Sequence, residues 1–172
     1  ADYLMDWNQV KQWIRCRLVN TEKNMILLAG MPHREILDLS VVYYVQIALS
    51  KGSEGIIHIS NEYMKLWDVD EGILYDEAWK NMREADDAEC DSIVNVIGRS
   101  LGIEVQQTGL PGKQIYVLSK KKKLYGAVYM LNQDKMMKIA ENICSDLWII
   151  PSSVHESIII PSGRKEHAAE LA

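Results

Sequence analysis

The feature that most constrains the fold is a pair of apolar, β-branched runs near the C-terminal end of the chain. Trp148-Ile-Ile-Pro151 and Ser157-Ile-Ile-Ile-Pro161 flank a short polar insert at residues 152–156. Because β-branched side chains suit a pleated surface packed on a core, both runs are predicted to be buried strands. The hydroxyl, imidazole and carboxylate groups of the insert would lose free energy on burial unless they were paired. The insert is therefore the first place to look for a site.

The pattern of apolar residues and chain breakers predicts an α+β fold, with a mainly antiparallel sheet built from hairpins and about four to five helices packed on it. Helices are predicted over residues 7–18 (with Asp6 as N-cap), 61–67, 70–83, 87–101 and 133–144. Strands are predicted over 37–49 and 55–60 around a turn at 51–53, over 114–119 and 124–131, and on both sides of the insert. One domain over residues 1–172 is expected.

Composition indicates an ordinary globular chain. Its 172 residues are 48% hydrophobic and 25% charged, enough for a substantial core. No apolar run approaches the ~20 residues of a membrane span, and no signal peptide is evident. Because the chain starts at Ala1 without an initiator Met, we expect the C-terminal part of a longer protein. Cys16, Cys90 and Cys144 are odd in number and far apart, which favours free thiols and the cytoplasm.

The insert suggests an enzyme hypothesis. Ser152 or Ser153 would be the nucleophile, His155 the base and Glu156 its orienting carboxylate. Strand alternation argues against this, because His155 and Glu156 would point to opposite faces, with Glu156 buried beside Ile158. There is also no G-x-S-x-G motif. A structural turn is therefore favoured.

A pocket assembled across the fold would add His33 and Asp38 to the insert, and this is kept as the alternative, a hydrolase or small-ligand-binding enzyme. No pair of the four histidines has the spacing of a metal motif, and no phosphate-binding glycine motif occurs. We therefore predict no cofactor and no metal.

Charge is unevenly distributed along the chain. Lys120–Lys123 gives four consecutive cations between Tyr116 and Tyr125, which would suit a nucleic-acid contact, although the net charge of −5 and a solvated turn argue against it. The segment 68–91 is strongly acidic. Such segregated charge suits a protein partner or self-association.

Several segments together resemble an uncharacterised bacterial family, DUF5688, found mostly in gut clostridia. The matching segments are Arg17–Asn24, Met31–Leu39, Asn61-Glu62 with Trp67, Ala78 with Asn81, Tyr116–Ser119, Leu124–Ala127 and Ile150–Glu156. The resemblance implies no assigned activity. It does imply a set of recurring polar positions as candidate site residues: Asn20, Asn24, His33, Asp38, Asn81, Ser152, Ser153, His155 and Glu156.

No catalytic signature is present, while charge is segregated. The leading hypothesis is therefore a cytoplasmic, non-catalytic domain that binds another macromolecule or regulates it, in the setting of a mobile element or prophage. A protein partner or a second copy is expected, and a membrane is not.

Overall fold

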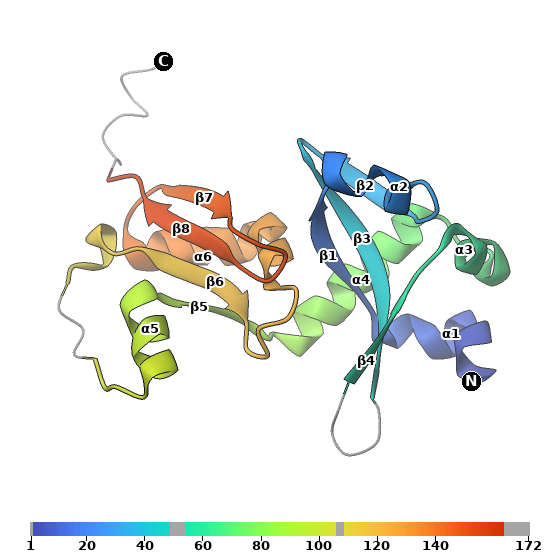
Figure 1. The fold of residues 1–172 in the computed structure, drawn as a ribbon, viewed down its shortest axis with the longest axis horizontal. Helices are drawn as coiled ribbons and strands as arrows, with labels where there is room; N and C mark the ends of the chain where they lie inside the picture. The colour runs from blue at the N-terminus through green and yellow to red at the C-terminus, as the bar shows by residue number, and fades with distance from the viewer. Residues whose placement is uncertain (1, 49–53, 106–108, 164–172) are drawn as a thin grey trace. The chain divides into compact units, whose positions relative to one another are not determined.

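The computed structural model describes residues 2–48, 54–105 and 109–163, which form helices and two antiparallel four-stranded sheets (Figure 1). The predicted α+β class is confirmed. The chain divides into two compact units, Ala1–Asp86 and Asp87–Ala172, each with its own sheet. The single domain stays a prediction.

The sheet of the first unit is built around one long strand. Its strands are β1 (Ile14–Asn20), β2 (His33–Ile36), β3 (Leu39–Ala48) and β4 (Glu54–His58). β1 pairs along one edge of β3, while β2 and β4 pair with successive parts of the other edge. The apolar run Val41–Val45 is buried throughout, as expected for a central strand. The predicted hairpin of β3 and β4 is confirmed, and its turn at 51–53 lies outside the described residues.

The described residues of this unit form four α-helices. They are α1 (Trp7–Val10), α2 (Met25–Leu28), α3 (Asn61–Trp67) and α4 (Glu71–Ala85), with 3-10 turns at Asp2–Met5, Lys11–Trp13 and Glu22–Asn24. α4 packs across β1 and buries Leu74, Ala78 and Met82. It begins as predicted, because the Asp70 side chain accepts a hydrogen bond from the Ile73 N–H.

The predicted helix over 7–18 is wrong in its second half. Only Trp7–Val10 is α-helical, and Asp6 caps it. From Ile14 the chain is a strand in which buried Ile14, Cys16 and Leu18 alternate with half-buried residues. This period of two fits a strand that pairs with β3 and packs against α4. That packing overrides the helical spacing that links Ile14 and Leu18 to Trp7 and Val10.

The second unit contains β5 (Ala88–Ser92), β6 (Tyr116–Lys120), β7 (Leu147–Pro151) and β8 (Ser157–Pro161), in the order β5-β6-β8-β7. Its helices are α5 (Ile93–Leu101), α6 (Gln133–Ile143) and the 3-10 segments η5 (Pro111–Lys113) and η6 (Gly126–Leu131). In Figure 1, α5 lies in front of the sheet beside β5, and α6 passes behind it. The predicted strand pair around the polar insert is confirmed as β7 and β8.

Three predictions in this unit are wrong. β7 is not a buried strand, because it lies at the edge of the sheet, where Trp148 and Ile150 are exposed. The helix predicted over 87–101 starts only at Ile93, because Ala88–Ser92 pairs with β6 and the Ser92 side chain caps the helix. The strand predicted over 124–131 is the 3-10 segment η6. There Gly126 approaches other backbone so closely that a Cβ would lie 2.4 Å from Lys120 N and 2.7 Å from His155 O.

No helix in the described part of the chain is both long and apolar enough to cross a membrane.

Candidate functional site

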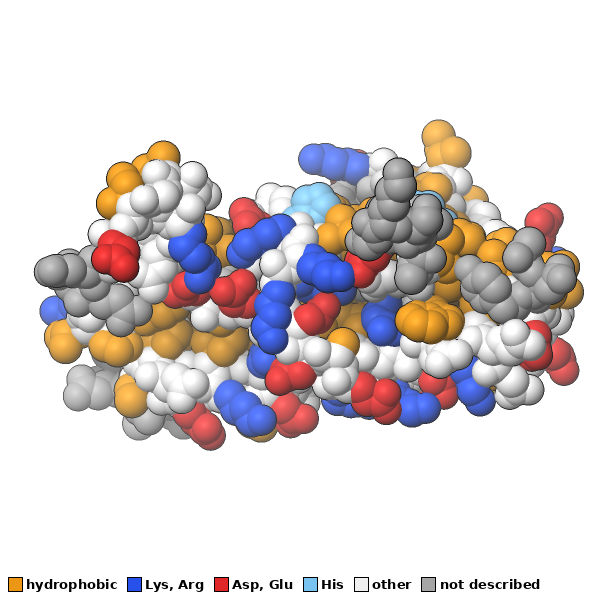
Figure 2. Space-filling model, turned by 90° about the horizontal axis from the view of Figure 1, so that it is seen from below, with side chains coloured by type: hydrophobic (Ala, Val, Ile, Leu, Met, Phe, Trp, Pro, Cys, Tyr) orange, Lys and Arg blue, Asp and Glu red, His pale blue; other side chains and the backbone are white. Residues whose placement is uncertain are grey.

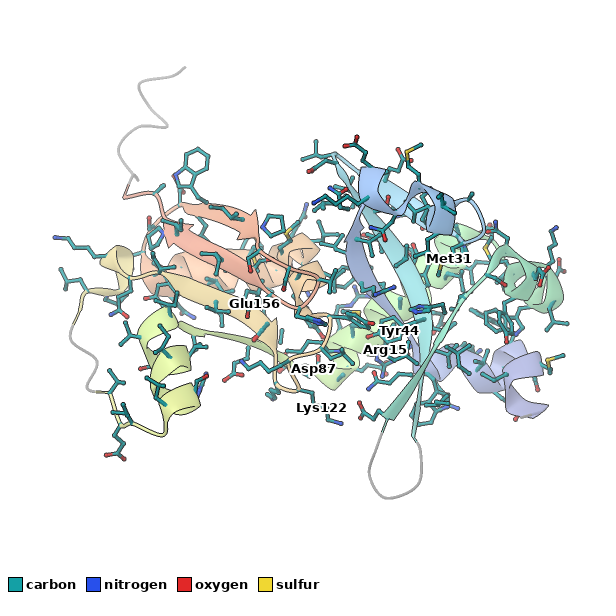
Figure 3. All side chains as sticks on the ribbon, in the orientation of Figure 1. Arg15, Met31, Tyr44, Asp87, Lys122 and Glu156 are labelled. Carbon is teal, nitrogen blue, oxygen red and sulfur yellow. The ribbon has the colours of Figure 1, made fainter. Side chains whose placement is uncertain are left out.

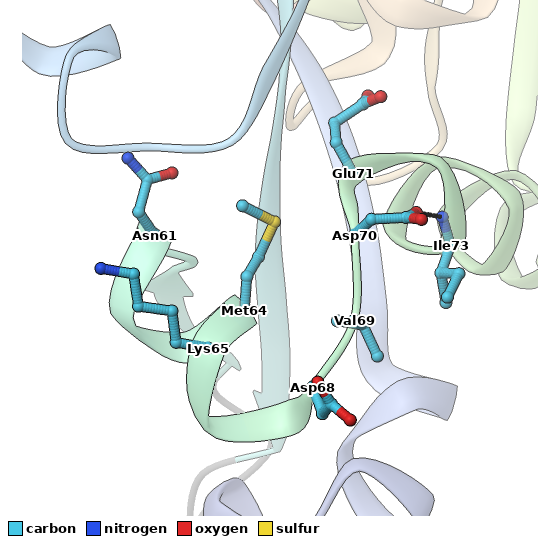
Figure 4. Close-up of a pocket in the computed structure, with 8 residues that line it drawn as sticks. All are labelled: Asn61, Met64, Lys65, Asp68, Val69, Asp70, Glu71 and Ile73. Atoms are coloured by element: carbon cyan, nitrogen blue, oxygen red, sulfur yellow. Dashed lines mark hydrogen bonds between the residues drawn. The ribbon is translucent and has the colours of Figure 1, made fainter.

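A groove of about 760 Å³ opens in the first unit between α3 and the first turn of α4. Figure 4 shows α3 on one side of it, α4 on the other and the connecting turn at the end. Its lining combines polar and apolar side chains: Asn61, Met64, Lys65, Asp68, Val69, Asp70, Glu71 and Ile73.

Local sequence explains why the chain turns here. Asp68 ends α3 in the left-handed conformation (φ 54°), which Asp tolerates better than most residues. The Val69 N–H donates to the Met64 carbonyl, and Asp70 then caps α4. The turn therefore fixes the spacing between the two walls of the groove.

Glu71 belongs to a network that ties α4 to the sheet. Its carboxylate accepts a hydrogen bond from the Tyr43 hydroxyl, and Arg34 Nη2 donates to Oε2 at 2.8 Å. The Arg34 guanidinium also lies 3.8 Å from the centroid of the Tyr75 ring. Burial, followed by the hydrogen bond to Glu71, raises the pKa of Tyr43 above its usual range. Tyr43 is therefore a neutral donor and Glu71 a paired carboxylate, so neither is poised as a base or nucleophile.

The predicted polar insert is a compact turn between β7 and β8, and Figure 3 labels Glu156 in it. The N–H groups of Ser152 and Ser153 both donate to the Glu156 carbonyl at 3.2 Å. The Ser153 hydroxyl accepts from the His155 N–H at 3.0 Å. Both serines are thus used in backbone contacts, as in an ordinary serine turn. Glu156 is only half-buried, contrary to the prediction, because the buried face of β8 carries Ser157 and Ile159.

The His155 ring is fixed from the other side by the start of η6. Its Nδ1 accepts a hydrogen bond from the Tyr125 N–H at 3.2 Å, and the two rings stack with centroids 5.4 Å apart. The Gly126 N–H donates to the His155 carbonyl. Within residues 2–48, 54–105 and 109–163, neither a serine hydroxyl nor a carboxylate hydrogen-bonds to the ring. The geometry supports a structural role, in which His155 binds the turn to the start of η6. We call this set of contacts a clasp.

His33 and Asp38 belong to the first unit, whereas the turn at residues 152–156 belongs to the second. His33 is half-buried on β2, with Nδ1 2.9 Å from the Met31 carbonyl and Nε2 3.8 Å from Glu35. Asp38 is exposed in the turn after β2, where its carbonyl accepts from the Thr21 N–H. The pocket that would combine His33 and Asp38 with this turn stays a prediction. No cluster of three metal-ligating side chains occurs in the portion of the chain described.

The three asparagines expected from the family resemblance also make backbone contacts. The Asn20 side chain accepts from the Lys23 N–H, and Asn24 Nδ2 donates to the Asn20 carbonyl. Asn81 is buried and donates to two carbonyls at and just before the start of β1, at 2.7 and 3.0 Å. At each of the three positions, one polar atom of the side chain thus binds backbone.

Lys120 does not belong to an exposed basic tip. It is the last residue of β6 and is buried, with Nζ 3.3 Å from Asp87 Oδ2. The Tyr129 hydroxyl donates to the other oxygen of the same carboxylate. The expectation that Lys120 contacts nucleic acid is therefore wrong, because its charge is neutralised inside the unit.

The other lysines of the run lie in the loop after β6. Lys123 Nζ is 3.1 Å from the Ser119 hydroxyl and 3.7 Å from Glu89. Lys121 and Lys122 are exposed, and a nucleic-acid contact through them stays a prediction. On the face shown in Figure 2, basic and acidic side chains are interspersed.

Sequence reasoning missed the groove, because it treated α3 and α4 as separate helices. The only signal was the short connection Asp68-Val69-Asp70, which forces two capped helices to lie close together.

The fold and the groove place the chain in the α+β class, and this class is not tied to one activity. The family model of DUF5688, a family of unknown function, matches residues 1–172, and the chain belongs to this family. No curated protein and no solved structure matches it.

Proposed function

We propose that the chain is a non-catalytic binding domain whose α3–α4 groove takes a basic, partly apolar segment of a protein partner. The observation that carries this proposal is the composition of the groove, in which Met64, Val69 and Ile73 lie among carboxylates. Lys and Arg side chains suit such a lining, since their aliphatic stems cover apolar surface while their charged ends reach acidic groups.

Charge around the groove supports a cationic partner. Arg34 already neutralises Glu71, which leaves Asp68 and Asp70 against Lys65. Asp70 uses one oxygen, Oδ1, to cap α4. The Glu71 network holds the α4 wall in place, so little ordering entropy would be lost on binding.

The rival functions have less support. The hydrogen bonds of the insert explain a structural turn, and they do not pair a nucleophile with a base at Ser152, Ser153 and His155. Of the predicted cationic run, Lys120 is buried and Lys123 is paired. The free cysteines are consistent with the reducing cytoplasm that we propose as the compartment, and a bacterial mobile element stays the proposed setting.

Fluorescence anisotropy with a labelled peptide of alternating Lys and Leu would test the proposal, with a Glu-Leu peptide of equal length as the negative probe. We expect the Lys-Leu peptide to bind and the Glu-Leu peptide not to bind. Ile73→Lys should weaken binding by about tenfold or more, and Asp68→Asn by about threefold.

The matched control is Asp76→Asn, an exposed carboxylate on α4 that does not line the groove. It should leave the affinity unchanged. Equal binding of both peptides, or equal effects of Asp68→Asn and Asp76→Asn, would contradict the proposal.

A further inference from the structure

One sheet face in the second unit is only partly covered. Val117 on β6 lies opposite Ile158 on β8, which lies opposite Ile150 on β7; Ile160 on β8 lies opposite Trp148. Because side chains two residues apart on a strand share a face, all five point to the same side of the sheet. They form an apolar block without an ionisable group.

α5 covers only the β5–β6 end of this face. Arg99 of α5 forms ion pairs with Glu89 (3.3 Å) and Asp91 (2.8 Å), and Asp91 lies opposite Val117. Val117 is accordingly buried. Beyond it, over β8 and β7, the block is open: Trp148 is 66% exposed and Ile150 49%.

The helical elements η6 and α6 lie on the opposite face. The Ser157 hydroxyl donates to the carbonyl of Ala127 in η6, and Ser157 is adjacent to Ile158 on β8, so it points to the other side of the sheet. Figure 1 shows α6 on that side as well. Strands lie about 4.8 Å apart and packed helices about 10 Å apart, so two strands give room for roughly one helix. Over β8 and β7, this place is empty among the described residues.

α5 itself presents an apolar stripe to solvent, in addition to the open sheet block. Val94, Ile97 and Leu101 are spaced three and four residues apart on one side of the helix, and Leu101 is 66% exposed. The opposite side of the helix already contacts its own sheet. That side contacts β5 through the Arg99 ion pairs, so the apolar stripe faces away from the sheet and suits a second surface.

We propose that these two features bind each other in a symmetric dimer, with α5 of each copy lying over β7 and β8 of the other. The two helices would then form one layer between two sheets. The contact is isologous, because every copy supplies one helix stripe and one open sheet block. The side chains of the stripe and of the block are uncharged, and Glu156, two residues before Ile158, borders the block at the end of β8.

The dimensions agree with this arrangement. A nine-residue helix is about 13 Å long, and a five-residue strand about 17 Å. Each copy contributes seven large apolar side chains: Val94, Ile97, Leu101, Trp148, Ile150, Ile158 and Ile160. A standard-size interface buries about 800 Å² per partner. We expect so short a helix on two strands to bury less than this area. We therefore expect a reversible dimer. The surface lies outside the α3–α4 groove and does not depend on its function.

Sedimentation velocity of the full chain over a range of concentrations tests the dimer. The wild type should shift from monomer to dimer as concentration rises. Ile97→Lys on the stripe and Ile150→Lys on the sheet should each weaken dimerisation at least tenfold. Ile26→Lys, at a 96% exposed position on α2 of the first unit, is the matched control and should dimerise like the wild type. Circular dichroism would confirm that each variant is folded.

A mixing experiment separates helix-on-sheet contact from other modes. Ile97→Lys and Ile150→Glu alone should be monomeric, but mixed they should form a heterodimer, because the new lysine meets the new glutamate in one half of the interface. A wild type that stays monomeric at every concentration would overturn the proposal. So would a dimer insensitive to Ile97→Lys, or mixed variants that stay monomeric. Loss of peptide binding in the groove would not affect these readouts.

Discussion

The buried ammonium of Lys120 lies 3.3 Å from the Asp87 carboxylate, which joins the end of β6 to the residue before β5. Tyr129 from η6 donates to the same carboxylate. The run of four lysines predicts a surface position for Lys120, but its ammonium group lies in the interior. Figure 3 shows Asp87 and Lys122, which lies in the loop that follows Lys120.

Asp87→Ala should lower the free energy of unfolding by about 2–4 kcal/mol, because it leaves the Lys120 charge buried without a partner. Urea denaturation measures the change. Glu141→Ala removes an exposed carboxylate of the same unit and should stay within about 0.5 kcal/mol of the wild type. Equal effects of the two substitutions would show that Lys120 reaches water.

Gly126→Ala should destabilise the second unit by about 3 kcal/mol or more, because the added methyl group would lie 2.4 Å from Lys120 N and 2.6 Å from Ser119 C. Backbone atoms cannot rotate away as a side chain can. Gly30→Ala is the control, since its nearest atom lies at 3.9 Å. Thermal denaturation compares the two, and an unchanged melting temperature for Gly126→Ala would contradict the close approach of η6 to β6.

His58 should make stability fall on mild acidification. Partial burial, and then the Arg17 guanidinium, lower the pKa of His58 below its ordinary value of 6.5. The unfolded chain then binds a proton more readily than the folded one, so this stability is present above pH 6.5 and is lost as the pH falls through and below that value. His58→Gln should therefore lose less stability between pH 7.5 and 5, measured by urea midpoints. Parallel curves would show that the two states bind the proton equally.

The three cysteines should differ in reactivity. Burial, and then Asp91, raise the pKa of the Cys90 thiol to about 11, whereas Cys144 is exposed. At pH 8 only about one Cys90 in a thousand would be a thiolate. Iodoacetamide should therefore label Cys144 first, as read by peptide mass mapping. In urea, labelling of all three should become similar, and prompt native labelling of Cys90 would contradict its burial.

Much of the secondary structure follows from local pattern. α4 combines a helical apolar stripe with an Asp70 cap, and both operate within a few residues. The two β-branched runs became β7 and β8 because no helical alternative suits them. In contrast, the spacing of Ile14 and Leu18 fits both a helix and a strand, and only pairing with β3 decides between them.

The candidate site was less predictable. The insert at 152–156 attracted attention by its residue types, but the hydrogen bonds to Tyr125 and Gly126 come from a segment about thirty residues earlier. The α3–α4 groove and the open sheet block consist of residue types that are common at any surface. They stand out only because other elements of the fold leave them uncovered. No local pattern reports that.

The sequence by itself determined the α+β class, the family, most helices and the β7–β8 pair, because periodicity, capping and β-branching act over short distances. Only the tertiary structure decided that the Ser-Ser-Val-His-Glu turn is a clasp, that Lys120 is buried and that one side of the second sheet is half covered. Each of these depends on groups distant in sequence, whose pairing offsets a desolvation cost that no single segment can meet alone.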